Sequence, residues 1–201
     1  MSHYMRIEQL PYCCVPASLL MVLHRRGLPA PSQAELGYQL GLTVPADMQQ
    51  LFPRTHNLEA GPAGYGTQLQ RPEFSLNAAL ERLNIPLQCR FIWGAELTTP
   101  AALAETLTAL VGRSSPDAVS DVLACFDVQV LNDGATTRSG LGHVAVVAGF
   151  DAAAQEITLI DPSPRSSGWR QVGLAQLQQA MALHGTAAMG GLWVLEPRTE
   201  G

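Results

Sequence analysis

Two adjacent cysteines, Cys13 and Cys14, stand at the start of an apolar segment in the run QLPYCCVPASLLMVLHRRG, residues 9–27. The spacing of apolar residues, the basic last turn and the terminal glycine predict a helix over 13–26. Free backbone N–H groups and the helix dipole favour a thiolate at such an N-terminus. Cys14 is therefore a candidate nucleophile. The alternative is that both cysteines are small buried hydrophobic residues, as most cysteines are.

A nucleophilic thiol needs a base, and the base needs a group that orients it. His143 begins the strand-like run GHVAVVAGFD, and Asp161 ends the run EITLID. If these runs pair as antiparallel strands, the start of the first and the end of the second lie at the same edge of the sheet. We therefore expect His143 and Asp161 to meet there. A histidine at the surface and an aspartate that ends a strand before a proline are each common, so neither residue alone indicates a catalytic site.

Acyl transfer also needs donors for the oxyanion that develops on the attacked carbonyl, commonly a side-chain amide together with the N–H of the nucleophile. Gln9 lies on the segment that leads into the predicted helix, five residues before Cys14. It is the candidate side-chain donor. The alternative is a solvated loop glutamine.

The runs Q-x4-CVPASLLMVL, GHVAVVAGFD and ITLIDP together resemble the papain-like bacteriocin-processing peptidases, the double-glycine leader peptidase family. The family's nucleophile motif, D-C-G-x-A-[CS]-L-x-M, aligns with residues 13–21 and places Cys14 at the nucleophile. The resemblance implies that His143 is the base, Asp161 its partner and Gln9 the oxyanion donor. It also implies a papain-like fold and an amide-cleaving activity.

The chain departs from that pattern at several positions. Cys13 stands where the family usually has aspartate, and Cys13 itself remains an alternative nucleophile. Val15 replaces the usual glycine after the nucleophile. The family's glutamine usually precedes the cysteine by six residues, which is the position of Glu8, so Glu8 and Gln9 both remain candidates for the oxyanion position. Members of the family are often the front end of a peptide-exporting transporter, whereas we expect a stand-alone domain here.

The elements that must position these residues change in kind along the chain. Helical patterns precede strand patterns, which predicts an α+β fold: one papain-like domain over 1–201, with a helical lobe over about 1–112 and an antiparallel sheet lobe over about 117–197. The segment 43–74 is rich in proline and glycine and is expected to be irregular. Helices are predicted over 13–26, after Ser32, and over 75–84, 99–112 and 173–184; strand-like runs are 87–93, 121–131, 142–151, 156–162 and 190–197.

The composition limits which partners, compartment and cofactors are expected. A net charge of -5 disfavours nucleic acid or an anionic membrane as the main partner. No apolar run is long enough to span a bilayer, and the first residues lack the pattern of a signal peptide, so we expect a cytoplasmic protein. The four cysteines show no zinc-ligand spacing, and we expect neither a metal nor an organic cofactor. His24, His56 and His184 are expected to be solvated or to cap helix ends.

The expected function is hydrolysis of an amide bond in a peptide or protein substrate by a Cys14–His143–Asp161 triad through a thioester. Two alternatives remain open. The same triad would serve a thiol acyltransferase, transpeptidase or deamidase, and a chain with an unreactive Cys14 would be an inactive binding module. The substrate and any partner protein are not evident from the sequence.

Overall fold

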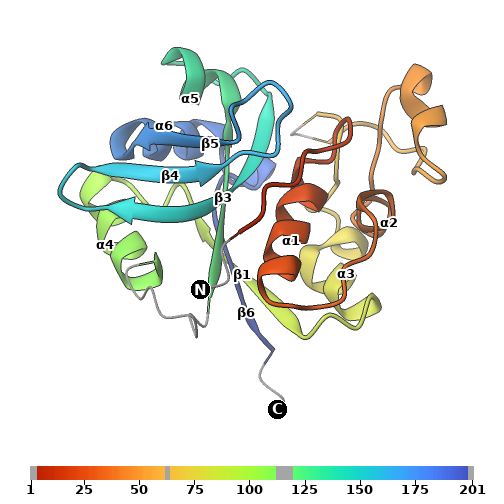
Figure 1. Ribbon diagram of the computed structural model, residues 1–201. Coiled ribbons are helices and arrows are strands. Elements are labelled where there is room, and N and C mark those ends of the chain that lie inside the picture. The colour runs from red at the N-terminus through yellow and green to blue at the C-terminus, as the bar shows by residue number, and fades with distance from the viewer. Residues whose placement is uncertain (1–3, 62–63, 112–119, 199–201) are drawn as a thin grey trace.

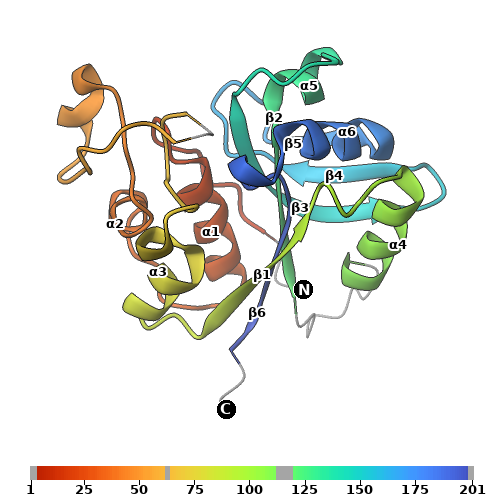
Figure 2. The same cartoon turned by 180° about the vertical axis from the view of Figure 1, so that it is seen from behind.

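The computed structural model describes residues 4–61, 64–111 and 120–198 of the chain. A group of helices from the N-terminal half lies beside an antiparallel sheet, whose opposite face is covered by further helices (Figures 1 and 2). None of the helices in these ranges combines the length and apolar character needed to span a bilayer.

The helical lobe is built around α1 (Cys14–Arg25), which packs against α2 (Gln33–Gln39) on one side and against the sheet on the other. Because α1 is covered on both sides, its apolar residues are buried all round rather than along a single stripe. Serine side chains cap the two shorter helices. Ser32 Oγ accepts a hydrogen bond from the Glu35 N–H at the start of α2, and Ser75 does the same at the start of α3 (Leu76–Arg82).

The sheet and the helices on its far side comprise β1 (Leu87–Trp93), α4 (Pro100–Val111), β2 (Asp121–Asp127), β3 (Gly142–Asp151), β4 (Glu156–Ile160), β5 (Trp169–Gly173), α6 (Leu174–His184) and β6 (Gly191–Pro197). The strand order is β1-β6-β2-β3-β4-β5, with every neighbouring pair antiparallel. Successive residues of the central strand β2 alternate between its faces: Leu123 packs on the α1 side, and Phe126 packs on the side of α4 and α6. Helices thus cover both faces.

Three features differ from the expectation. The run 121–131 is not one β segment, because Asp127 accepts hydrogen bonds from the N–H groups of Gln129 and Val130 and so starts the helix α5 (Val128–Asp133). The edge strand β5 was not expected. The boundary between lobes also lies earlier than residue 112, since β1 pairs with β6 and α4 packs against β2, β3 and α6. Residues 112–117, between the two expected lobes, lie outside the described ranges.

The segment 43–74 is irregular, as expected, apart from the 3-10 turns η1 (Ala46–Leu51) and η2 (Pro72–Phe74). Thr43 and Gly66 exchange backbone hydrogen bonds, so the segment folds back on itself and returns toward α1. Residues 62 and 63 fall outside the described ranges. A third 3-10 turn, η3 (Thr186–Ala188), joins α6 to β6.

The C-terminal end of α1 is fastened to the sheet by a buried carboxylate. Asp121, at the start of β2, is 1% exposed and forms ion pairs with Arg25 and Arg26. The Tyr4 hydroxyl donates a third hydrogen bond to the same carboxylate. Charges that leave water in this way must be paired, and here the two arginines and the tyrosine satisfy the aspartate.

Candidate active site

Cys14 is the first residue of α1, and it lies on the wall of a cavity of about 520 Å³ between the helical lobe and the sheet. Residues on both sides reach this cavity: Gln9 and Cys14 from the helical lobe, and His143 from the start of β3. The first helical residue has a backbone N–H without an acceptor inside the helix. The cavity therefore meets the positive end of the α1 dipole at the position of the Cys14 thiol.

His143 and Asp161 meet at the edge of the sheet where β3 begins and β4 has just ended. The Nε2 of His143 lies 2.7 Å from Oδ1 of Asp161, and both side chains are buried. The antiparallel pairing of β3 and β4 brings them together, as the sequence pattern predicts. Since Nε2 is used by the aspartate, Nδ1 is the ring nitrogen left to face a group in the cavity, whose wall also includes Cys14.

Several donors hold the Asp161 carboxylate in place. Oδ1 also accepts the Ser163 N–H at 2.8 Å, and Oδ2 lies 3.4 Å from the Arg170 guanidinium. Burial acts to raise the pKa of Asp161, but the hydrogen bond from His143, the charge of His143 and those neighbours outweigh it and lower the pKa. Asp161 is thus held as a carboxylate beside the imidazole.

The imidazole of His143 is held in its charged form. Burial alone would lower the pKa of His143, but hydrogen bonds to Asp161 and Cys14 and the charges of both groups raise it to about 9. A protonated His143 beside Asp161 thus places a positive charge on the cavity whose wall also includes Cys14.

Cys13 has a different environment from Cys14 although the two are adjacent. Cys13 is completely buried among Leu42, Val44 and Phe52, and it does not reach the cavity. Burial, together with the neighbouring Cys14, raises the pKa of Cys13 to about 12. A thiolate is therefore disfavoured at Cys13, and the geometry favours Cys14 of the two.

Gln9, and not Glu8, reaches the cavity. The Gln9 backbone N–H donates to the Pro162 carbonyl at 2.9 Å, which ties this segment to the residue after Asp161. The Gln9 amide makes no hydrogen bond with the described residues, and its Oε1 is buried without a partner. Glu8 is exposed, and its carboxylate lies 4.0 Å from Arg6.

The cavity also contains a histidine that the sequence pattern placed in solvent. His184 is 1% exposed, and neither ring nitrogen has a hydrogen-bond partner in the described part of the chain. Burial and the nearby charge of Arg138 lower the pKa of His184 to about 4, so the ring is neutral at pH 7. The expectation of a solvated or capping residue is wrong for His184. The signal was present: His184 continues the helical spacing of Leu177 and Met181, both of them buried.

The other walls come from segments whose sequence offered no clear signal. The returning part of segment 43–74 supplies Tyr65 and Leu69, and the β4–β5 loop supplies Ser163 and Arg165. Within the described ranges, no three histidine, cysteine, aspartate or glutamate side chains are grouped so that they could hold a metal ion.

Comparisons with known proteins bear on the fold. No protein-family model and no curated protein matches this chain. Among solved structures, it is similar to the peptidase domain of Streptococcus ComA, a bifunctional ABC transporter involved in a quorum-sensing pathway, with 18% identity and a TM-score of 0.52 over 98% of this chain and 100% of that one. It is also similar to a Bacillus anthracis protein described as a C39-like peptidase, with 14% identity and a TM-score of 0.58 over 100% of this chain and 98% of that one. The chain therefore has the papain-like α+β fold of C39-type peptidase domains, as the sequence motifs predict.

Proposed function

We propose that the chain is a cysteine peptidase that cleaves an amide bond in a peptide or protein substrate. The observation that carries this proposal is the arrangement on one cavity: Cys14 at a helix N-terminus and His143 line the same cavity, and the Nε2 of His143 lies 2.7 Å from a buried carboxylate. Acyl transfer to a side chain requires a nucleophile, a base that accepts its proton, and a group that orients the base.

In the proposed reaction the Cys14 thiolate attacks the carbonyl carbon of the scissile amide. The proton that Cys14 has lost resides on His143, whose raised pKa keeps it there at neutral pH. When the tetrahedral intermediate collapses, His143 donates this proton to the leaving amine and a thioester to Cys14 remains. Water, deprotonated by His143, then attacks the thioester and releases the acid and the free thiol.

Asp161 fixes the imidazole in this scheme. With Nε2–H donated to Asp161, the Nδ1 side of the ring faces Cys14, and the carboxylate stabilises the imidazolium. Arg170 and the Ser163 N–H hold the carboxylate from the other side. The base is thereby oriented before the substrate binds.

The oxyanion would be held by the Gln9 amide and the Cys14 backbone N–H. The only Gln9 atom buried without a partner among the described residues is Oε1, an acceptor, so the oxyanion would be bound by the Nε2 group of the same amide; the Cys14 N–H belongs to the first helical residue, which has no acceptor within the helix. Donors left free in this way can bind a negative oxygen without first breaking another hydrogen bond. Removing one such donor typically lowers kcat by about 10²- to 10³-fold.

The first experiment measures the pH dependence of Cys14 alkylation by iodoacetamide in the wild type and in His143→Ala. Cys13 and Cys14 share the tryptic peptide 7–25, so the modified residue must be located by fragmentation of that peptide in the mass spectrometer. We expect rapid alkylation of Cys14 below pH 7 that is lost in His143→Ala. Alkylation that follows the ordinary thiol pKa of ~8.5 and ignores His143→Ala would favour an inactive binding module.

Peptide cleavage is then tested with a proteome-derived peptide library, incubated with the wild type and with Cys14→Ala. We expect new peptide termini only with the wild type. Repeating the incubation with an added amine separates hydrolysis from acyl transfer, because a transferase would form the amide of that amine in place of the free acid. Formation mainly of the new amide would replace peptidase by transferase as the function.

A further inference from the structure

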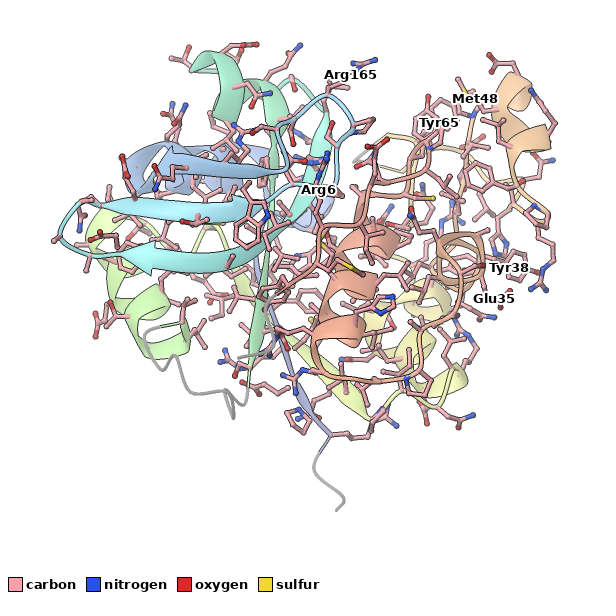
Figure 3. All side chains as sticks on the ribbon, viewed as in Figure 1. Arg6, Glu35, Tyr38, Met48, Tyr65 and Arg165 are labelled. Atoms are coloured by element: carbon pink, nitrogen blue, oxygen red, sulfur yellow. The ribbon has the colours of Figure 1, made fainter. Side chains whose placement is uncertain are left out.

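The cavity has an uneven distribution of charge. Among the described residues that line it, Arg165 alone carries a permanent charge, and none is an aspartate or glutamate. The wall opposite Arg165 includes Met48 and Tyr65, from the segment 43–74. Figure 3 shows Arg165 on the sheet side of the gap between the lobes, with Tyr65 and Met48 on the other side. The cavity therefore has a cationic side chain on one wall and the large side chains of Met48 and Tyr65 on the other.

Arg165 differs from most of the arginines that the structure describes, because its side chain has no partner among the described residues. Arg25 and Arg26 are paired with Asp121, and Arg170 is paired with Asp161. The Arg165 side chain is exposed and makes no hydrogen bond or ion pair with the described residues; only its backbone N–H is bonded, to the Ser163 hydroxyl. Its five N–H donors are therefore available to a ligand.

The loop that carries Arg165 is held firmly by another arginine. The Arg6 guanidinium donates to the carbonyls of Asp161 at 3.2 Å, Ser163 at 2.7 Å and Ser166 at 3.4 Å. At the end of the loop, Gly168 has φ +89°, and a Cβ there would lie 2.4 Å from the Arg6 side chain. The backbone of Arg165 is thus fixed although its side chain is free, which reduces the entropic cost of binding a ligand there.

The position of this loop relates Arg165 to one half of a substrate. The loop follows Asp161 directly, and Asp161 bonds His143, the group that protonates the leaving amine in the proposed reaction. The part of the peptide that begins with the leaving amine must lie against His143. Because His143 and Arg165 line the same cavity, the loop of Arg165 offers a surface against which the next residues of that part could lie.

We infer that Arg165 binds a carboxylate on the leaving half of the substrate, so that the enzyme prefers peptides with aspartate or glutamate within the first three positions after the scissile bond. The inference rests on the proposed peptidase function. A guanidinium binds a carboxylate through two parallel N–H···O hydrogen bonds, which a neutral or basic side chain cannot accept.

The test compares cleavage of a proteome-derived peptide library by the wild type, Arg165→Glu and Arg165→Gln. Arg71→Glu is the matched control, because it makes the same change of charge at an arginine that does not line the cavity. Preference is then measured as kcat/KM on peptide pairs that differ only by glutamate or lysine at the selected position. We expect the wild type and Arg71→Glu to favour glutamate by about 10- to 100-fold, the range for a charge-assisted hydrogen bond.

Arg165→Gln is expected to lose this preference, and Arg165→Glu to reverse it in favour of lysine. A reversal distinguishes recognition from a merely structural role, which would reduce cleavage of both peptides alike. Wild-type cleavage without enrichment of acidic residues, or an unchanged preference in Arg165→Glu, would overturn the inference while leaving the peptidase function in place. An absence of any Cys14-dependent cleavage, together with slow Cys14 alkylation, would overturn both.

Discussion

A buried carboxylate lies near each end of helix α1, but the polar groups around the two carboxylates differ in whether they have hydrogen-bond partners. At the C-terminal end, the buried carboxylate of Asp121 is matched by Arg25, Arg26 and Tyr4, so its polar atoms are satisfied within the protein. At the N-terminal end, the buried carboxylate of Asp161 is matched by His143, but the buried Oε1 of the Gln9 amide has no hydrogen-bond partner in the described part of the chain. Because buried polar groups are nearly always satisfied, the unpartnered amide marks the end that is built to receive a ligand.

Replacing the nucleophile is the strongest test of this difference. We expect Cys14→Ala to lower kcat by about 10⁶-fold, as removal of a catalytic nucleophile does elsewhere, while the protein remains folded. Cys13→Ala is the matched control and should retain most of the activity, since Cys13 does not reach the cavity. The measurement is cleavage of a substrate peptide, with circular dichroism to establish folding. Greater loss in Cys13→Ala than in Cys14→Ala would reverse the assignment.

The next largest effect is expected at Asp161. Asp161→Asn keeps the shape of the side chain but removes the charge that fixes the imidazole, and we expect kcat to fall by about 10⁴-fold. The pKa of His143 should also fall below about 9, because Asp161 is one of the groups that raise it. Histidine NMR titration measures this second change. A lowered kcat with an unmoved His143 pKa would point to a structural defect instead.

At the other end of α1, the corresponding change should affect stability and leave chemistry intact. Asp121→Asn leaves two arginines without their shared partner, and breaking such a buried pair costs about 3–5 kcal/mol in the free energy of unfolding. Urea denaturation measures this loss, with Asp47→Asn, an exposed carboxylate, as control. Below the unfolding transition, kcat per folded molecule should stay within a few-fold of the wild type. A much larger fall in kcat would show that the two ends are not independent.

The unpartnered amide predicts a specific effect on rate. Gln9→Ala should lower kcat by about 10²- to 10³-fold with little change in stability, because the Gln9 amide has no hydrogen bond to lose in the free protein. Glu8→Ala, one residue away and outside the cavity, is the control and should be nearly silent. Equal effects of the two substitutions would remove Gln9 from the oxyanion site.

The smallest effect is a pH dependence. Since the pKa of His143 is raised to about 9, the protonated imidazole that the proposed reaction requires is lost as the pH rises through that value. We therefore expect kcat/KM to decline on the basic side near pH 9. Protonated His143 also adds to the free energy of unfolding, because its pKa is higher in the folded than in the unfolded protein. This contribution is complete below the unfolded pKa of ~6.5 and is lost as the pH rises above the pKa in the folded protein. A basic limb near pH 6.5 would contradict the raised pKa.

The order of the elements and the meeting of His143 with Asp161 could be predicted from the sequence. Both follow from local periodicity and from the pairing of two strands that are neighbours in the chain, which place the start of β3 and the end of β4 at one edge. The same local reasoning failed for α5, where the cap formed by Asp127 outweighed the β-rich composition of the run. It also failed for β5, which pairs only with β4 at the edge of the sheet and has an irregular pattern of burial.

The sequence by itself determined which residues are able to do chemistry: a thiol at a helix N-terminus, an imidazole and a carboxylate at one sheet edge, and an amide nearby. Only the tertiary structure decided which of the paired candidates faces the cavity. Cys13 and Cys14, like Glu8 and Gln9, are adjacent in the chain, and the packing of distant segments buries or exposes each of them. The placing of Arg165 opposite Tyr65 depends on the same long-range contacts, which no local pattern encodes.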